Sequence, residues 1–211
     1  MVIDDIKSKI IANPFSCTYP WVVDWINDHL KMLPHGSKFV ELGTFVGGTS
    51  RLIALANPHL EIHTIDVYNI YDPENMGMIE QLELTYGIKN VRNGIIRDIQ
   101  RMHLEDLPNV FRYTDNGINI PVTNFHASFV DAHHGYADIF ADLDFAWNNT
   151  VDGGFIFGDD IDSPNVYNAV AHWAHKKGIE FTIFSKAFKI IKSTPKYIFT
   201  SQLQRKFSHT G

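Results

Sequence analysis

The stretch KFVELGTFVGGTS, residues 38–50, decides the fold. Residues 38–42 have the pattern of a buried strand, and residues 48–56 have that of a helix, which Asn57-Pro58 ends. Between them, Gly43 permits a tight turn, while Gly47 and Gly48 let a ligand or a neighbouring backbone approach the helix start, where N–H groups point outward. The stretch therefore predicts a strand, a glycine turn and a helix, with a ligand site at the turn.

Strands and helices alternate along the rest of the chain. The predicted strands cover residues 38–42, 61–66, 91–96, 125–131 and 154–158, and the predicted helices cover residues 48–56, 73–86, 136–148 and 164–177. This alternation predicts βαβ units and an α/β fold with a mostly parallel sheet. For residues 98–124 we expect a short helix followed by a loop or a small hairpin.

Length and breaker residues predict a single domain of 211 residues with additions at both ends. Helical patterns over residues 2–12 and 21–32, separated by Asn13, Pro14 and Pro20, form an N-terminal helical extension over residues 1–35. The core covers residues 36–165. Residues 166–211 add the last helix and two strand-like runs, 181–191 and 196–201.

Composition excludes several classes of protein. Apolar residues make up 45% of the chain and aromatic residues 13%, which is enough for a real core and excludes disordered and fibrous proteins. The lone cysteine, Cys17, cannot form an internal disulfide and suits a reducing compartment. The sequence shows neither a signal peptide at its start nor an apolar run long enough to span a membrane. We therefore expect a cytoplasmic protein with no membrane partner.

The net charge of −6 is unevenly distributed. Residues 176–211 hold eight of the 18 basic residues and one of the 24 acidic residues, so the rest of the chain is strongly acidic. An acidic bulk argues against a general nucleic-acid binder. The basic segment is either the solvated face of edge strands or a surface that attracts an anionic group or partner.

Acidic residues lie at or just after the end of every predicted strand, at the sheet edge where α/β proteins bind ligands. They are Glu41, Asp66, Asp98, Asp131, Asp159 and Asp160. The glycine turn is not a dinucleotide fingerprint, because Phe45 stands where that motif needs glycine, and it lacks the Gly-Lys-Ser/Thr ending of a P-loop. By itself the turn is also compatible with an ordinary strand-to-helix connection.

The turn resembles motif I of the class I S-adenosylmethionine-dependent methyltransferases, in the variant E-x-G-x-x-x-G-G-[ST]. The resemblance implies a Rossmann-like fold with a seven-stranded sheet and helices on both faces. It also implies that Asp66 bonds the ribose hydroxyls of the cofactor, which a carboxylate can do by accepting from both at once, and that Asp98 lies near the adenine. The implied cofactor-binding residues are Glu41, Gly43, Thr44, Phe45, Gly47, Thr49, Asp66 and Asp98.

A second cluster contains Asp131, Asp159 and Asp160, at the ends of two strands that we expect to be neighbours. Three close carboxylates repel one another, so either their pKa values rise or a cation lies among them. Oxygen ligands favour Mg²⁺, Mn²⁺ or Ca²⁺ over zinc. A set of surface turn acids is the alternative.

The residues around this cluster are similar to those of the metal-dependent O-methyltransferases related to macrocin O-methyltransferase. The pattern D-x-x-H-x-Y-x-x-x-x-x-D and then G-G-x-x-x-x-D-D is met by Asp131, His134, Tyr136, Asp142, Gly153, Gly154, Asp159 and Asp160. With motif I, the resemblance covers about residues 36–165. It implies that Asp131, Asp159 and Asp160 hold Mg²⁺ or another divalent cation, with Asp131 and His134 as catalytic residues and His134 as the general base. His134 could instead cap a helix or support Asp131.

The resemblance implies an S-adenosylmethionine-dependent, Mg²⁺-dependent O-methyltransferase that acts on a hydroxyl of a small molecule. Two alternatives remain: a metal-dependent enzyme of the same fold with another reaction, such as hydroxylation, and a non-catalytic module that binds a cofactor or a sugar. The aromatic residues of the N-terminal extension, including Trp21 and Trp25, favour core packing or a homodimer over an aromatic lid.

Overall fold

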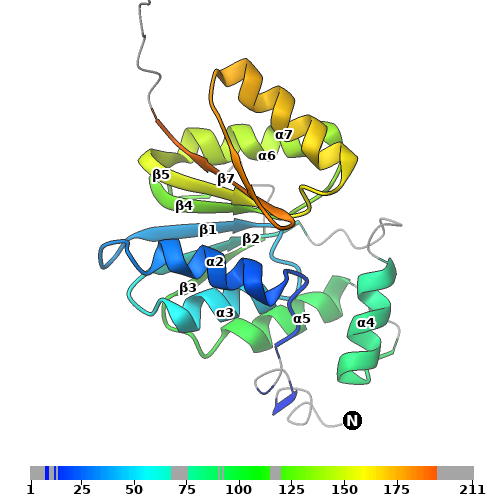
Figure 1. The fold of residues 1–211 in the computed structure, drawn as a ribbon. Coiled ribbons are helices and arrows are strands. Elements are labelled where there is room, and N and C mark those ends of the chain that lie inside the picture. Colours follow the sequence, from blue (N-terminus) through cyan, green and yellow to red (C-terminus); the bar gives the residue numbers. More distant parts are fainter. Residues whose placement is uncertain are drawn as a thin grey trace, which may run out of the picture.

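A computed structural model of the chain describes residues 8, 9, 12, 14–67, 76–89, 91, 93–114 and 120–193. Figure 1 shows a central sheet covered by helices on both faces. Most of the predicted helix over residues 2–12, and all of the predicted strand over residues 196–201, lie outside the described residues. In the described part of the chain, no helix is long and apolar enough to cross a membrane.

Seven strands form one sheet in the order β3-β2-β1-β4-β5-β7-β6. Neighbouring strands from β3 to β5 pair in parallel, whereas β7 is antiparallel to both β5 and β6. The α/β fold and the seven strands agree with the prediction, but the sheet is mixed at one edge. The strands are β1 (Lys38–Leu42), β2 (Glu61–Ile65), β3 (Val110–Tyr113), β4 (Phe125–Val130), β5 (Thr150–Gly158), β6 (Thr182–Phe184) and β7 (Ala187–Ile191).

The helices divide between the two faces of the sheet. One face is covered by α2 (Pro20–Leu30), α3 (Gly48–Ala56) and α5 (Asn93–Leu104), with α4 (Met76–Tyr86) beyond them, and the other by α6 (Tyr136–Asn149) and α7 (Pro164–Lys177) (Figure 1). Prolines at the first positions of α2 and α7 fix helical φ where no N–H bond is needed. Gly178 ends α7 in the left-handed conformation.

One predicted strand was wrong, and one strand-like run divides into two strands. The third strand, expected at residues 91–96, is β3 at residues 110–113, and residues 93–104 form helix α5. The short apolar run Ile95–Ile96 suggested a strand, but Ile96, Ile99 and His103 recur at helical spacing and are all buried. The run 181–191 is a hairpin of β6 and β7, because the chain turns at Ser185, whose φ is +56°.

Apolar side chains form a core on each face of the sheet. Alternate residues of β1 separate the two cores, since Val40 and Leu42 pack toward α6 and α7 while Phe39 packs toward α2 and α3. A third apolar cluster joins α4 and α5 to Val46 of the glycine turn. The glycine turn therefore packs against α4 and α5.

Strand register brings the predicted site residues to one edge. Leu42 pairs with Ile65 on one side and with Val130 on the other, and Val130 pairs with Gly158. The residues that follow these positions are Gly43, Asp66, Asp131 and Asp159. They therefore leave the sheet side by side at its carboxyl edge.

Candidate functional site

Gly43 lets the end of β1 pack directly against the end of β4. Its φ is +89°, and a Cβ atom there would lie 2.1 Å from the carbonyl oxygen of Asp131 and 2.5 Å from the Cα of Ala132. Phe45, two residues further along the turn, also has a positive φ, of +48°. A non-glycine residue in this region stores strain, which is common at ligand-binding turns.

The backbone of the turn holds the Asp66 carboxylate. The N–H of Phe45 donates to Asp66 Oδ2 at 2.5 Å, and Asp66 is half-buried at the end of β2. The structure thus places Asp66 beside the glycine turn. Gly47 caps the start of α3 with a φ of +83° and packs against Gln100 and Leu104 of α5.

Three other residues predicted to bind the cofactor have buried side chains bonded within the chain. The Ser50 hydroxyl donates to Glu41 Oε2, and burial raises the pKa of Glu41 to about 8. The Thr44 hydroxyl donates to the carbonyl of Ile65 at 3.3 Å, and Thr49 contacts the N-terminal segment. Glu41 therefore joins β1 to α3. The motif matches whether Glu41 makes this internal contact or binds a cofactor, so the motif alone does not separate the two roles.

The premise that placed Asp98 near the cofactor is wrong. Asp98 does not follow a strand but lies within α5, with its side chain 67% exposed and an oxygen 3.9 Å from Arg101. The strand that ends beside Asp66 is β3, since the N–H of Asp66 donates to the carbonyl of Tyr113.

A buried hydrogen-bond network that sequence reasoning missed supports the glycine turn. The N–H of Phe15 donates to the Tyr86 hydroxyl at 2.8 Å, and that hydroxyl lies 3.1 Å from His103 Nε2. His103 Nδ1 bonds the carbonyl of Val46. Since the carbonyl must accept, Nδ1 carries a proton. Burial lowers the pKa of His103 and keeps the imidazole neutral, so Nε2 accepts from the Tyr86 hydroxyl. No local motif marks this network, because its members lie on four separate elements.

His103 is expected to make the protein less stable in mild acid. Burial lowers its pKa from 6.5 to about 4, with Arg51 adding to the effect. Between these values the unfolded chain binds a proton that the folded chain does not, so stability falls as pH drops from about 6.5 toward 4, by up to about 3 kcal/mol. The measurement is urea unfolding of the wild type and of His103→Gln across this range. Glutamine keeps a donor and an acceptor but does not titrate, so its curve should be flatter. Parallel curves would contradict the assignment.

The segment Phe15–Thr18, called here the strap, crosses the start of α3. A Cβ atom on Gly48 would lie only 1.7 Å from the carbonyl oxygen of Phe15, so the strap passes directly over this glycine. The Ser16 hydroxyl lies 2.7 Å from that of Thr49, at the helix start. The N-terminal extension is therefore part of the site, although the motifs lie outside it.

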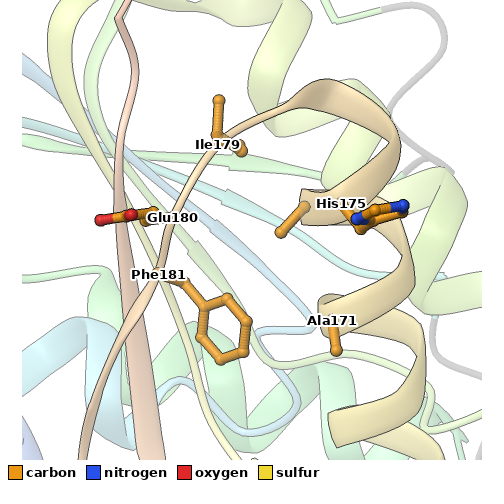
Figure 2. Close-up of a pocket in the computed structure, with 6 residues that line it drawn as sticks. Ala171, His175, Ile179, Glu180 and Phe181 are labelled. Atoms are coloured by element: carbon orange, nitrogen blue, oxygen red, sulfur yellow. The ribbon is translucent and has the colours of Figure 1, made fainter. Parts of the chain in front are cut away.

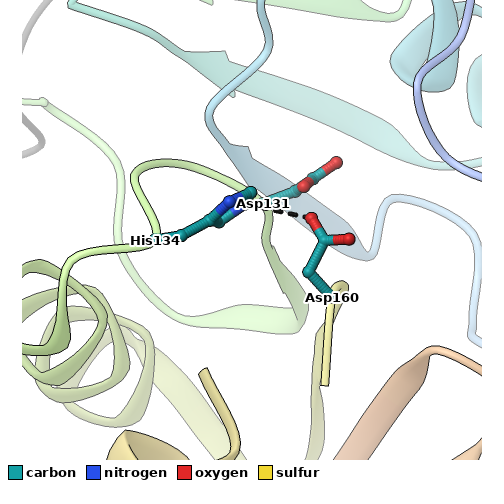
Figure 3. A group of neighbouring side chains, drawn as sticks. All are labelled: Asp131, His134 and Asp160. Atoms are coloured by element: carbon teal, nitrogen blue, oxygen red, sulfur yellow. Dashed lines mark ion pairs between the residues drawn. The ribbon is translucent and has the colours of Figure 1, made fainter. Parts of the chain in front are cut away.

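An acidic cluster lies beside the turn, at the ends of β4 and β5. One ligand atom from each of Asp131, His134 and Asp160 lies within 4.8 Å of the other two, and His134 Nε2 is 3.0 Å from Asp160 Oδ2 (Figure 3). Asp159, the third predicted metal ligand, is 8% exposed, and its Oδ1 accepts from the N–H of Asp160 at 2.9 Å. The structure thus groups His134 with two of the predicted acids, and Asp159 braces the Asp160 backbone, whose φ is +55°.

Burial and neighbouring charge raise the pKa values of Asp131 and Asp159. Burial, followed by the charges of Asp159, Asp160 and Glu41, raises the pKa of Asp131 well above its usual range, and His134 opposes the effect. Burial and the Asp160 charge also raise the pKa of Asp159 to about 6. A concentration of buried negative charge of this kind suits a cation.

The remaining motif residues brace α6. The Tyr136 hydroxyl bonds His172 Nδ1 of α7, so this tyrosine ties the two helices of that face together. Burial, with the charge of Asp138, raises the pKa of Asp142 to about 6. The contact with His172 accounts for Tyr136 without a role in chemistry.

A pocket of about 350 Å³ lies away from this edge. It is formed by the last turns of α7 and the segment that follows, and it is lined by Ala171, Ala174, His175, Ile179, Glu180 and Phe181 (Figure 2). Because α7 starts after the carboxyl end of β5 and runs back along the sheet, its last turn lies at the opposite edge. The pocket is therefore separate from the acidic cluster.

No family model and no curated protein matches this sequence, but solved structures share its fold. The O-methyltransferase NovP superposes with a TM-score of 0.61 and 16% identity, over 87% of this chain and 84% of that one. An S-adenosylmethionine-dependent O-methyltransferase from Thermotoga maritima gives 0.53 and 12%, over 90% and 71%. A precorrin-8w decarboxylase from Methanobacterium thermoautotrophicum gives 0.52 and 14%, over 84% and 92%. At these identities the likeness establishes the fold alone.

Proposed function

We propose that this protein is an S-adenosylmethionine-dependent O-methyltransferase that uses a divalent cation and acts on a hydroxyl of a small molecule. The observation that carries the proposal is the contact of Gly43 with the backbone of Asp131 and Ala132. This contact places the glycine turn, to which Asp66 is bonded, next to the acidic cluster. A cofactor end and a metal end thereby adjoin at one edge of the sheet. The fold shared with solved methyltransferases supports the same conclusion.

The residues present fit S-adenosylmethionine. Asp66 offers a carboxylate at the end of β2, fixed by the Phe45 N–H, and a vicinal diol matches the two oxygens of a carboxylate. The strained turn residue Phe45 and the glycines around it allow close approach to the backbone. We do not assign Asp98 to the cofactor site, because its side chain is exposed on α5.

The residues present also fit a divalent cation. Asp131 and Asp160 contribute carboxylate oxygens. The raised pKa of Asp131 reflects burial first and then neighbouring negative charge, which a cation would offset. Mg²⁺ commonly binds through one or two carboxylates and keeps several waters. With Mg²⁺ at these two acids, the His134 imidazole remains available to accept a proton.

S-adenosylmethionine held at the glycine turn and Asp66 would supply the methyl group and would leave as S-adenosylhomocysteine. A cation held by Asp131 and Asp160 would lower the pKa of the acceptor hydroxyl. The part of this chain is to hold the groups and remove the proton. The His134 side chain is 33% exposed, and its Nε2 lies 3.0 Å from Asp160 Oδ2. Because a carboxylate only accepts, Nε2 donates to Asp160, and Nδ1 is the nitrogen that takes the hydroxyl proton. Asp160 then stabilises the resulting imidazolium.

A turnover assay tests the proposed reaction. The purified chain is incubated with S-adenosylmethionine and a panel of hydroxylated small molecules, and S-adenosylhomocysteine is measured with Mg²⁺, with Mn²⁺ and with EDTA. We expect product with metal and its loss with EDTA. Cofactor binding without methyl transfer to any acceptor would favour the non-catalytic module. Modification of an acceptor without S-adenosylhomocysteine would favour another metal-dependent reaction.

The acceptor is expected to meet aromatic residues where the extension joins the sheet. Tyr19 and Trp21 stack with ring centroids 4.7 Å apart, and Trp21 Nε1 donates to Ser185 Oγ between β6 and β7. Lys186 lies over the Tyr19 ring and pairs with Asp162, two residues beyond Asp160. The stacked pair therefore lies near the segment that follows Asp160, at the edge of the sheet that carries the acidic cluster.

Trp21→Ala is expected to raise the KM for the acceptor by about 5- to 10-fold, because an aromatic contact contributes about 1 kcal/mol. Trp21 is 48% exposed, so the fold should tolerate the change. The measurement is steady-state kinetics with the acceptor found in the panel, and Met32→Ala, at 79% exposure on the same segment, is the control. An unchanged KM would remove Trp21 from the acceptor site.

A further inference from the structure

We infer that Thr18, in the strap, is a positioning residue for the acidic cluster: it is the last of three hydroxyls that lead from the strap and the start of α3 to the carboxylate of Asp131. The inference rests on the proposed function, because it assigns Thr18 a role in the metal end of that site. Neither of the two motif clusters includes Thr18.

The contacts form a continuous chain. The Ser16 hydroxyl lies 2.7 Å from Thr49 Oγ1, the Thr49 hydroxyl donates to Thr18 Oγ1 at 3.1 Å, and the Thr18 hydroxyl donates to Asp131 Oδ2 at 3.2 Å. Each hydroxyl has one proton to give. Thr49 gives its proton to Thr18 and Thr18 gives its proton to Asp131, so these two donors point toward the carboxylate. The proton of Ser16 has two acceptors within reach, Thr49 Oγ1 and the carbonyl of Thr18 at 3.2 Å.

Burial makes these contacts specific. Thr18 is 2% exposed and Thr49 is 6% exposed, so neither hydroxyl can exchange its partner for bulk water without a cost. Donors in series polarise one another in a low-dielectric interior. The bond to Oδ2 fixes the rotation of the Asp131 carboxylate, and it favours the charged form that a cation requires.

The backbone fixes the position of the strap itself. Its carbonyl at Phe15 occupies the space that a side chain at position 48 would fill, and the N–H of Phe15 donates to Tyr86. Thr18 is therefore held from both sides, by the contacts of the strap on α3 and α4 and by Asp131. A residue held in this way can orient a metal ligand, as outer partners of metal ligands commonly do.

Calorimetric titration of the full chain with Mn²⁺ and with Mg²⁺, and separately with S-adenosylmethionine, tests the inference. Thr18→Val is expected to weaken metal binding by about 10- to 100-fold, the range for lost outer partners of metal ligands, with cofactor affinity nearly unchanged. Thr18→Ser keeps the hydroxyl and should restore metal affinity. Thr18→Ala is a second hydroxyl-free variant, so the test does not depend on whether valine is accommodated.

Thr150→Val is the matched control. Thr150 is also 2% exposed, and its hydroxyl lies 2.8 Å from that of Ser128, but it begins β5 at the opposite edge of the sheet. The Thr150→Val variant should be less stable than the wild type but should bind the metal with the same affinity. Three results would overturn the inference. The first is equal metal affinity in the wild type and in Thr18→Val, and the second is an equal loss of metal affinity in Thr150→Val and in Thr18→Val. The third is a loss of cofactor affinity together with metal affinity in Thr18→Val. Absence of metal binding to the wild type would instead count against the proposed function.

Discussion

Asp160→Ala is expected to abolish metal-dependent methyl transfer and to weaken divalent-metal binding by more than about 100-fold. Outer partners of metal ligands cost 10- to 100-fold when removed, and a ligand itself should cost more. Asp160 also holds His134 through the 3.0 Å contact, so its loss displaces the proposed base as well. Calorimetry with Mn²⁺, and S-adenosylhomocysteine formation with saturating cofactor, measure the two effects.

Asp66→Ala is the complementary variant. Asp66 lies at the cofactor end and is bonded to the Phe45 N–H, whereas Asp160 lies at the metal end. We expect Asp66→Ala to weaken S-adenosylmethionine binding and to leave metal binding intact, and Asp160→Ala to do the reverse. Equal loss of cofactor affinity in both variants would contradict a site with two separate ends.

Gly43→Ala is expected to destabilise the protein by about 3 kcal/mol or more. A left-handed φ costs a residue with a side chain about 1–2 kcal/mol, and forcing an atom into packed structure costs about 1–3 kcal/mol more. Here the new Cβ atom would meet the carbonyl oxygen of Asp131 at 2.1 Å, so β1 and β4 must separate at the site. For a chain of this size the melting temperature should fall by about 6–12 °C.

Gly36→Ala separates strain from clash. Gly36 has a similar φ of +78°, but a Cβ atom there would have no neighbour within 4 Å. Gly36→Ala should therefore lower the free energy of unfolding only by the conformational cost of the left-handed φ, about 1–2 kcal/mol. Urea unfolding of the two variants measures the difference, and equal losses would show that the ends of β1 and β4 are not in close contact.

Much of the fold could be predicted because its signals are local. The strand, turn and helix at residues 38–50 follow from apolar runs and glycines, and acids mark the strand ends. The strand expected at residues 91–96 was wrong because its apolar pair belongs to a longer helical period, which a six-residue window does not reveal. Residues 181–191 read as one run because no glycine or proline marks the turn at Ser185.

The site could be predicted only in part, for a related reason. Asp66, Asp131 and Asp160 were found because they follow strands, and strand register aligns them. The hydroxyls of Ser16 and Thr18 and the imidazole of His103 reach the site from the N-terminal strap and from α5. Their roles depend on tertiary packing, and a single sequence gives no spacing rule for contacts between residues as far apart as Thr18 and Asp131.

Calorimetric titration of the wild-type chain with S-adenosylmethionine and with S-adenosylhomocysteine, in the presence of Mg²⁺ and again with EDTA, tests the central claim most directly. The glycine turn and Asp66 predict micromolar binding of both compounds, and binding that persists with EDTA, because the cofactor end does not need the metal. Absence of binding by both compounds would contradict the cofactor assignment and leave Asp131, His134 and Asp160 as the centre of a different chemistry.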